Sequence, residues 1–303
     1  MFLKNFWLKL SNNHEYQKIR NEKLRKKIIF KFKEEQEEKI NKIKEKINNQ
    51  NELNFLHSGH AADIINTLPV LKKLSKNHKC NLFINTNKPI KKYFKHPAGN
   101  YYLNDKIFEM LKPLINRQPF INKIEKYNSQ IIDINFDLLR QLPINLLFDN
   151  STYASVLTGV QTNLIEPFLE ADHHEEIVNK VIIQRTFRYR NDLIDYSFLN
   201  NFNDLFFVGT FEEYKDLKKI VKNLNFYDCK NFLEMASIVK SSKFILANSS
   251  ITFPIAEGLK VPRLLESSPV FPAAQPHGPD SFNFYFQSHF EEKFDFLYKR
   301  KKD

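Results

Sequence analysis

The sequence is short of the residues and motifs that several common protein classes require. It holds six glycines and two cysteines in 303 residues. Cys80 and Cys229 lie far apart and form neither a metal-binding spacing nor a disulfide framework, so a reducing compartment is expected. Neither the Gly-x-x-x-x-Gly-Lys phosphate loop nor the Gly-x-Gly-x-x-Gly dinucleotide motif occurs.

Long apolar segments are also missing. No apolar run approaches the roughly 18 residues that a membrane-spanning helix needs, and the first residues lack the apolar core and cleavage site of a secretory signal. We therefore expect a cytoplasmic location, with association to a membrane as a possible addition. The apolar content of 42% and aromatic content of 14% are typical of a globular protein.

Positive charge is concentrated at one end of the chain. The formal net charge is +11, and residues 1–50 hold 14 Lys or Arg against 7 Glu, so the other 253 residues carry only +4. A protein that binds nucleic acid usually presents a basic face on its folded body. The uneven distribution therefore argues against nucleic acid as a partner.

Residues 1–51 are predicted to form a basic helical arm. In Met1–Leu10, apolar side chains recur at helical spacing, namely Phe2, Leu3, Phe6, Trp7 and Leu10. Such a helix suits either peripheral contact with a membrane or packing on its own domain or on a partner subunit. Residues 15–48 are predicted to form a long charged helix, solvated or in a weak coiled coil.

From residue 52 onward, apolar strands alternate with helices. The predicted strands are Leu53–Leu56, Cys80–Ile84, Ile131–Ile134, Val181–Gln184, Leu205–Gly209, Phe244–Ala247 and Arg263–Leu265. The predicted helices are Asp63–Ser75, Asp105–Leu114, Phe211–Leu224, Phe232–Ser241 and Pro254–Leu259, with a closing helix near Tyr298. This alternation predicts an α/β protein with two parallel-sheet domains, 52–175 and 180–303, joined by a linker.

Two strand–turn–helix segments carry polar residues at positions suited to chemistry. In the first, the turn holds Ser58, Gly59 and His60, and Asp63 stands at the start of the helix. A carboxylate there is either a helix cap or a base that acts on a bound group. In the second, Asn248, Ser249 and Ser250 precede a short helix. That turn can hold phosphate oxygens, or can simply cap a helix that binds no ligand.

Both segments resemble signatures of the ADP-heptose:lipopolysaccharide heptosyltransferases, in glycosyltransferase family 9. Asp63–Leu71 is similar to the N-terminal signature, with Ala62 where the family has Gly. Residues 247–262 are similar to the C-terminal signature without gaps. The shared residues there are Asn248, Ser250, Ala256, Leu259 and Pro262, and the departures are Ser249, Ile251 and Pro254.

The resemblance implies a GT-B architecture, with two Rossmann-like domains that face a cleft. It also implies an inverting glycosyltransferase of lipopolysaccharide biosynthesis that needs no metal or other cofactor. The N-terminal domain would take a glycan or lipid-linked acceptor, next to the loop of Ser58, Gly59 and His60. The C-terminal domain would take a nucleotide-sugar, the co-substrate. Asp63 corresponds to the catalytic base of the family.

Further residues are candidates for the donor site. Arg185, Arg188 and Arg190 follow a predicted strand and could clamp a diphosphate, although a salt-bridged loop would look the same. Glu257 could accept hydrogen bonds from a ribose, or be an exposed helical residue. Gly209 could border the nucleoside, or only permit a tight turn.

Two alternatives stay open at this stage. The first is a catalytically silent GT-B-like protein that binds nucleotide or serves assembly, which the departures at Ser249 and Pro254 favour. The second is a basic nucleic-acid-binding protein, against which the concentration of charge in the arm argues. A metal site at His173 and His174 beside Asp172 and Glu175 is a weaker candidate. Neighbouring histidines in a linker seldom converge on one ion, so we predict no metal site.

Overall fold

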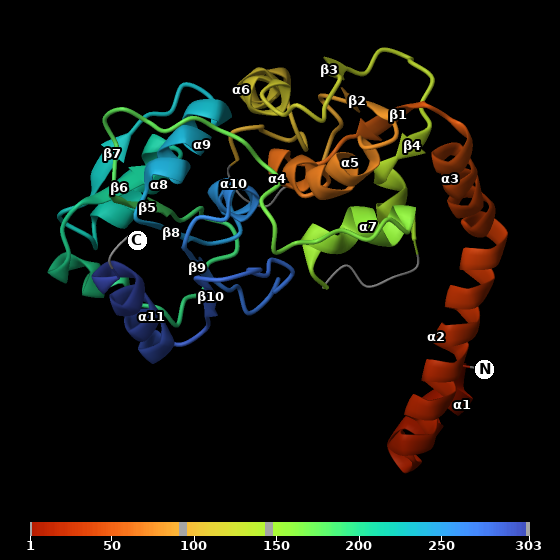
Figure 1. Ribbon diagram of the computed structural model, residues 1–303. Helices are drawn as coiled ribbons and strands as arrows, with labels where there is room; N and C mark the ends of the chain where they lie inside the picture. Colours follow the sequence, from red (N-terminus) through yellow and green to blue (C-terminus); the bar gives the residue numbers. More distant parts are fainter. Residues whose placement is uncertain (1, 91–95, 143–147, 301–303) are drawn as a thin grey trace.

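The computed structural model describes residues 2–90, 96–142 and 148–300, with side chains from residue 6 onward (Figure 1). Three helices come first, α1 (Phe2–Ser11), α2 (Asn13–Glu35) and α3 (Glu37–Asn49). Two parallel sheets with flanking helices follow. Among these residues no helix combines the length and the apolar content needed to cross a bilayer.

The first sheet has the strand order β3-β2-β1-β4, with all neighbours parallel. Its strands are β1 (Glu52–His57), β2 (Lys79–Ile84), β3 (Lys123–Lys126) and β4 (Ile134–Asn135). Its helices are α4 (Ala61–Ile65), α5 (Leu68–Leu74), α6 (Asp105–Asn116) and α7 (Tyr153–Thr158). His57, at the end of β1, pairs with Ile84 at the end of β2, so the loops after these strands meet at one edge.

The second sheet has the order β10-β9-β8-β5-β6-β7 and is also parallel. Its strands are β5 (Val181–Gln184), β6 (Leu205–Val208), β7 (Asn225–Tyr227), β8 (Phe244–Ala247), β9 (Arg263–Glu266) and β10 (Ser281–Phe284). Its helices are α8 (Phe211–Lys218), α9 (Phe232–Ser241), α10 (Thr252–Leu259) and α11 (Gln287–Lys299). The predicted strands Val181–Gln184 and Phe244–Ala247 and the predicted helix Phe232–Ser241 have the predicted bounds.

One apolar core runs through both halves of the molecule. It includes Ile64 of α4, Leu111 of α6, Val239 of α9 and Ile255 of α10. Accordingly α10 packs on α4, and α9 packs on α6. A second core, rich in phenylalanine, lies between the other face of the second sheet and α11. The shared core therefore joins the two halves, which lie side by side in Figure 1.

Some predicted elements differ from the structure. The predicted helix Asp63–Ser75 is two helices, α4 and α5, separated at Asn66 and Thr67. Pro69 stands in the first turn of α5, where its missing N–H is tolerated, and it cannot continue a helix from α4. The predicted strand Ile131–Ile134 reaches the sheet only at Ile134, and β3, β7, β10 and α7 were not predicted.

Candidate active site

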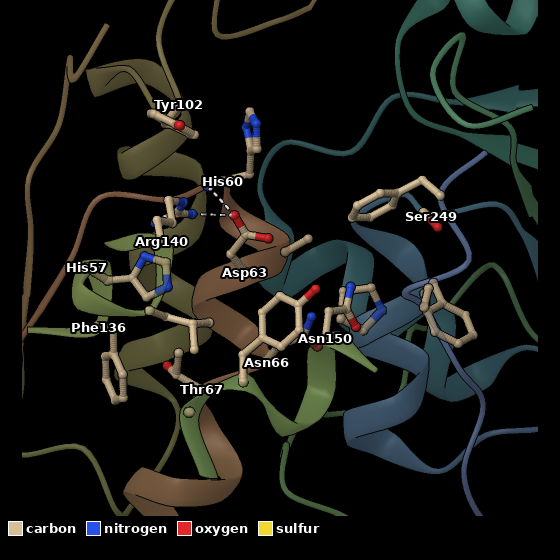
Figure 2. A pocket seen from close by; sticks show the side chains of 18 of the residues that line it. His57, His60, Asp63, Asn66, Thr67, Tyr102, Phe136, Arg140, Asn150 and Ser249 are labelled. Atoms are coloured by element: carbon tan, nitrogen blue, oxygen red, sulfur yellow. Dashed lines mark hydrogen bonds and ion pairs between the residues drawn. The ribbon is translucent and has the colours of Figure 1, made fainter. Parts of the chain in front are cut away.

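A cavity of about 320 Å³ lies between the two halves, and both contribute to its wall. Most of the wall is apolar. Its polar side chains include His60, Asp63, Arg140, Arg188, Ser249 and Ser250. Figure 2 shows Asp63 and Ser249 on opposite sides of this cavity. Asp63 lies on α4, the first helix after β1, and Ser249 lies in the turn after β8.

The turn after β1 is unusually crowded at Gly59. A Cβ atom placed there would lie 2.5 Å from Cε1 of His57, 2.6 Å from Nη2 of Arg140 and 2.7 Å from Oδ2 of Asp63. The Gly59 N–H donates to Nδ1 of His57 at 2.8 Å. Only glycine therefore lets the backbone pass between these three side chains.

Asp63 caps the start of its helix, which is one of the two roles that its position suggested, and it also forms an ion pair. Its Oδ2 accepts a hydrogen bond from the His60 N–H at 3.0 Å, which caps the start of α4. The same oxygen lies 3.1 Å from Nη2 of Arg140 (Figure 2). Burial acts to raise the pKa of Asp63, but the charges of His60 and Arg140 and the hydrogen bond from the His60 backbone outweigh it and lower the pKa. The carboxylate is therefore ionised at neutral pH while it faces the cavity.

Arg140 joins Asp63 to a second carboxylate that was not predicted. Its Nη1 lies 3.0 Å from Oδ1 of the buried Asp137. Asp137 also accepts hydrogen bonds from the Ser58 N–H at 3.1 Å, from the Ser58 hydroxyl, and from Lys88 at 2.8 Å. Burial alone would raise the pKa of Asp137, but the Lys88 and Ser58 hydrogen bonds lower it. Two carboxylates and two cations thus fix the turn that holds Ser58 and Gly59.

His57 lies beneath this turn as a buried, neutral side chain. Burial, followed by the charge of Arg140, lowers its pKa to about 4. Since Nδ1 accepts the Gly59 N–H, the ring proton is on Nε2. His57 therefore positions the turn and does not carry charge at neutral pH.

The three predicted donor-site arginines separate in the structure. Arg188 lines the cavity, with Nη1 at 3.4 Å from Nε2 of His60 across the two halves. Arg185 is buried in a two-bond ion pair with Glu266, at 2.8 and 2.9 Å. Arg190 pairs with Asp216 at 2.7 Å. Arg185 and Arg190 do not line the cavity, because their guanidinium groups are taken up in holding the loop after β5.

Tyr189 gives this loop a strained turn. Its φ is 61°, in the left-handed region that a bulky residue seldom adopts. The Tyr189 ring stacks on the Phe271 ring, with 4.7 Å between the centroids. The Arg188 guanidinium carbon lies 4.6 Å from the centroid of the same Tyr189 ring. Arg188, Tyr189 and Phe271 all line the cavity.

The turn before α10 contains a buried asparagine that holds the loop after β5 and a serine hydroxyl without a hydrogen-bond partner among the described residues. Asn248 is fully buried and donates through Nδ2 to the carbonyls of Thr186, at 3.0 Å, and Arg188, at 2.9 Å. It therefore holds the loop that carries Arg188 and does not reach the cavity. Ser249 and Ser250 line the cavity, and the buried Ser250 Oγ has no hydrogen-bond partner among the described residues.

Two other predicted donor-site residues lie away from the cavity. Glu257 is buried, pairs with Lys260 at 2.8 Å and with Arg263, and accepts the His277 N–H at 3.1 Å. Gly209 follows β6 with a φ of 142° and abuts the side chain of Gln184, so its backbone conformation accounts for glycine there. Neither residue is part of the cavity wall.

Within the described ranges no three histidine, cysteine or carboxylate side chains converge in a way that could hold a metal ion. In the linker, His174 contacts the Tyr227 hydroxyl at 3.1 Å, and its backbone N–H donates to Ser241. These two contacts give His174 a structural role.

Comparison with known proteins identifies structural neighbours only. No family model and no curated protein matches the chain. A family 9 glycosyl transferase from Veillonella parvula is similar at 14% identity and a TM-score of 0.52, over 84% of this chain and 90% of that one. The iron-containing dodecameric glycosyltransferase TibC from enterotoxigenic E. coli is similar at 11% identity and a TM-score of 0.51, over 78% of this chain and 62% of that one.

These two likenesses, at low identity, concern the fold. The two parallel sheets and the cavity between them agree with the architecture that the two sequence signatures predicted, and that prediction is confirmed at the level of the fold. The chain has a GT-B-like α/β fold, the fold of a family 9 glycosyl transferase structure.

Proposed function

We propose that this protein is an inverting glycosyltransferase that uses a nucleotide-diphospho-sugar as donor. The observation that carries the proposal is the placement of two opposed groups in one cavity. Asp63 stands on the wall from the first half, and Arg188, Ser249 and Ser250 stand on the wall from the second. A base facing an anion site is what transfer from a diphosphate leaving group requires.

Asp63 is the proposed base. An acceptor hydroxyl would attack the anomeric carbon while its proton passes to Asp63. The bond from that carbon to the diphosphate oxygen breaks, and its electron pair leaves with the diphosphate. Attack from the face opposite the leaving group inverts the anomeric centre. The lowered pKa of Asp63 keeps the carboxylate ready to accept a proton at neutral pH.

The leaving diphosphate would be held by the second half. Arg188 supplies a fixed positive charge and forked N–H donors. Ser249 and Ser250 stand before α10, an eight-residue helix whose first turn also reaches the cavity at Phe253 and Pro254. The unpartnered Ser250 hydroxyl is free to donate to a phosphate oxygen. Arg188 would supply the positive charge that a metal ion supplies in other transferases, and the two hydroxyls would add hydrogen bonds, so we propose transfer without a metal or other cofactor.

We further propose a hexosyl or heptosyl donor and a glycan or lipid-linked acceptor of the cell surface, as in lipopolysaccharide biosynthesis. This part rests on the two sequence signatures. The acceptor would enter beside Ser58, Gly59 and His60, where the turn is fixed by Arg140 and Asp137.

Donor binding is tested by measuring thermal shift and calorimetric affinity for each member of a panel of nucleoside diphosphates and nucleotide-sugars. We expect at least one nucleotide to raise the melting temperature of the wild-type protein and to have much less effect on Arg188→Ala. A matched control is Arg117→Ala, which removes an exposed arginine paired with Asp172. No binding by any member of the panel would contradict the proposal.

A nucleotide-binding protein without transferase activity is the second candidate. The contact between Arg140 and Asp63 favours it, because an ion pair that lowers the pKa of a carboxylate also lowers its affinity for a proton. Nucleotide binding without sugar transfer or donor hydrolysis would identify this candidate as correct.

A further inference from the structure

The N-terminal helices α1 and α2 expose an unusual amount of apolar surface. They stand clear of both sheets in Figure 1, and α2 has no buried residue over its 23 residues. On α1, Phe6, Leu10 and Trp7 are exposed, and Trp7 is 73% exposed. On α2 the exposed large apolar side chains are Leu24, Ile28, Ile29 and Phe30.

These side chains are arranged for contact with another surface. Phe6, Trp7 and Leu10 follow the i, i+1, i+4 spacing that places side chains on one side of a helix. Residues 20–30 of α2 are exposed on every side. Helices without tertiary packing are marginal in water, so a surface that covers these side chains would stabilise them.

Charge indicates what that surface is. Between Lys18 and Lys33, eight Lys or Arg stand against one Glu, Glu22. The cations are Lys18, Arg20, Lys23, Arg25, Lys26, Lys27, Lys31 and Lys33. A second copy of the chain packed along α2 would bring two such segments together and repel. The covering surface must therefore be anionic.

The apolar side chains distinguish between anionic surfaces. The phosphates of a nucleic acid would meet the lysines but leave Phe6, Trp7 and Leu10 in water. A lipid bilayer with anionic headgroups can bind both the apolar and the cationic side chains. Trp and Phe side chains insert at the level of the headgroups, while Lys and Arg side chains contact the headgroup phosphates.

We propose that α1 and α2 bind the surface of an anionic lipid bilayer. In this arrangement the apolar side of α1 lies in the headgroup layer and the cations of α2 contact lipid phosphates. The helices lie on the membrane and do not cross it. The contact is independent of the transfer reaction, since neither helix contributes to the cavity wall.

The chain offers a direct probe, because Trp7 is its only tryptophan. The full-length protein is mixed with vesicles of phosphatidylcholine alone, or of phosphatidylcholine with about 30% phosphatidylglycerol, at about 0.1 M salt. We expect the Trp7 emission to shift to shorter wavelength, and the protein to co-sediment, only with the anionic vesicles. Trp7→Ala should lower the co-sedimented fraction.

A charge variant and its control separate this contact from general charge attraction. Lys23→Glu, Lys26→Glu and Lys27→Glu together should lower the partition coefficient at least ~100-fold. The control reverses three exposed lysines of the body, Lys73, Lys106 and Lys230, and should bind as the wild type does.

Three results would overturn the proposal. The first is an unchanged Trp7 emission with anionic vesicles. The second is a blue shift in the protein alone that grows with protein concentration, which would identify a second copy as the covering surface. The third is a blue shift with duplex DNA equal to the shift with anionic vesicles.

Discussion

Arg140 holds the carboxylate of Asp63 in place from a neighbouring 3-10 helix, with Nη2 at 3.1 Å from Oδ2. Arg140 lies on the 3-10 helix η1 (Phe136–Gln141), directly after β4, while Asp63 lies on α4, directly after β1. Because β1 and β4 are adjacent parallel strands, their ends bring the two side chains together. The same guanidinium contacts the buried Asp137, so the orientation of Arg140 is fixed from both sides.

Replacing Arg140 should change the pH dependence of transfer. Burial raises the pKa of Asp63, and the charges of His60 and Arg140 lower it. Arg140→Gln removes one lowering charge, so the pKa of Asp63 should rise. A base works only when it is ionised, so the acidic limb of the rate profile should move to higher pH. The measurement is kcat/KM against pH, with Arg117→Gln as the control. An acidic limb at the wild-type position would contradict the role given to Arg140.

Removal of Arg188 should mainly weaken donor binding, whereas removal of Arg185 should mainly lower the free energy of unfolding. Arg188→Ala should weaken donor binding ~10- to 100-fold, because a charged donor to a phosphate is lost, with stability changed by less than ~1 kcal/mol. Arg185→Ala leaves the buried Glu266 without its cation and should cost about 3–5 kcal/mol of unfolding free energy. Calorimetry with the donor and urea unfolding measure the two effects. Equal loss of donor affinity in both variants, with no loss of stability, would contradict the assignment.

Gly59→Ala should disrupt the site through a single methyl group. The added Cβ would stand 2.7 Å or less from parts of His57, Arg140 and Asp63, so these side chains must move. Overpacking of this kind costs about 1–3 kcal/mol, and transfer should fall because Asp63 is displaced. Gly99→Ala is the control. It also adds a methyl group, at a positive φ of 58°, but nothing lies within 4 Å, so it should cost ~1 kcal/mol and leave transfer intact.

His57 should make the protein less stable in acid. Its pKa is lowered from 6.5 to about 4, first by burial and then by the charge of Arg140. Between these values the unfolded chain binds a proton that the folded protein excludes, so stability falls as pH decreases through this window, by about 3 kcal/mol in all. His57→Gln should lose less unfolding free energy than the wild type between pH 7 and pH 4, as measured by urea unfolding. Equal losses in both proteins would show that His57 is not the source.

Much of the architecture was predictable because apolar strands and helices alternate with clear periods. Phe244–Ala247 is apolar throughout and Val181–Gln184 is apolar except for Gln184; both are buried on both faces, which is the usual pattern of central parallel strands. Short edge strands such as β7 and β10 have weaker patterns, because β7 has no buried residue and β10 has one. The break between α4 and α5 depended on Pro69, whose effect on the preceding turn was not included in the prediction.

Part of the candidate site could be predicted from the sequence, namely Asp63 and the turn before α10, whereas the residues that surround them could not. Asp63 and the turn before α10 follow predicted strands, so their approach to one cavity follows from the parallel topology. Arg140 and Asp137 were missed because the predicted strand Ile131–Ile134 ended one residue before β4 does, and η1 was not predicted. The partners of Arg185 and Arg188 are Glu266 and His60, which are distant in the sequence. The local sequence therefore could not predict which arginine lines the cavity.

Turnover by wild type and Asp63→Asn tests the central claim most directly. Each protein is incubated with the nucleotide-sugar that it binds and with candidate acceptors, and release of nucleoside diphosphate and formation of product are followed. The account predicts that the wild type transfers sugar and that Asp63→Asn is slower by about 10²- to 10⁴-fold, with donor affinity within about twofold of wild type. Transfer by Asp63→Asn at the wild-type rate would contradict the account, as would a wild type that binds the donor and never transfers its sugar.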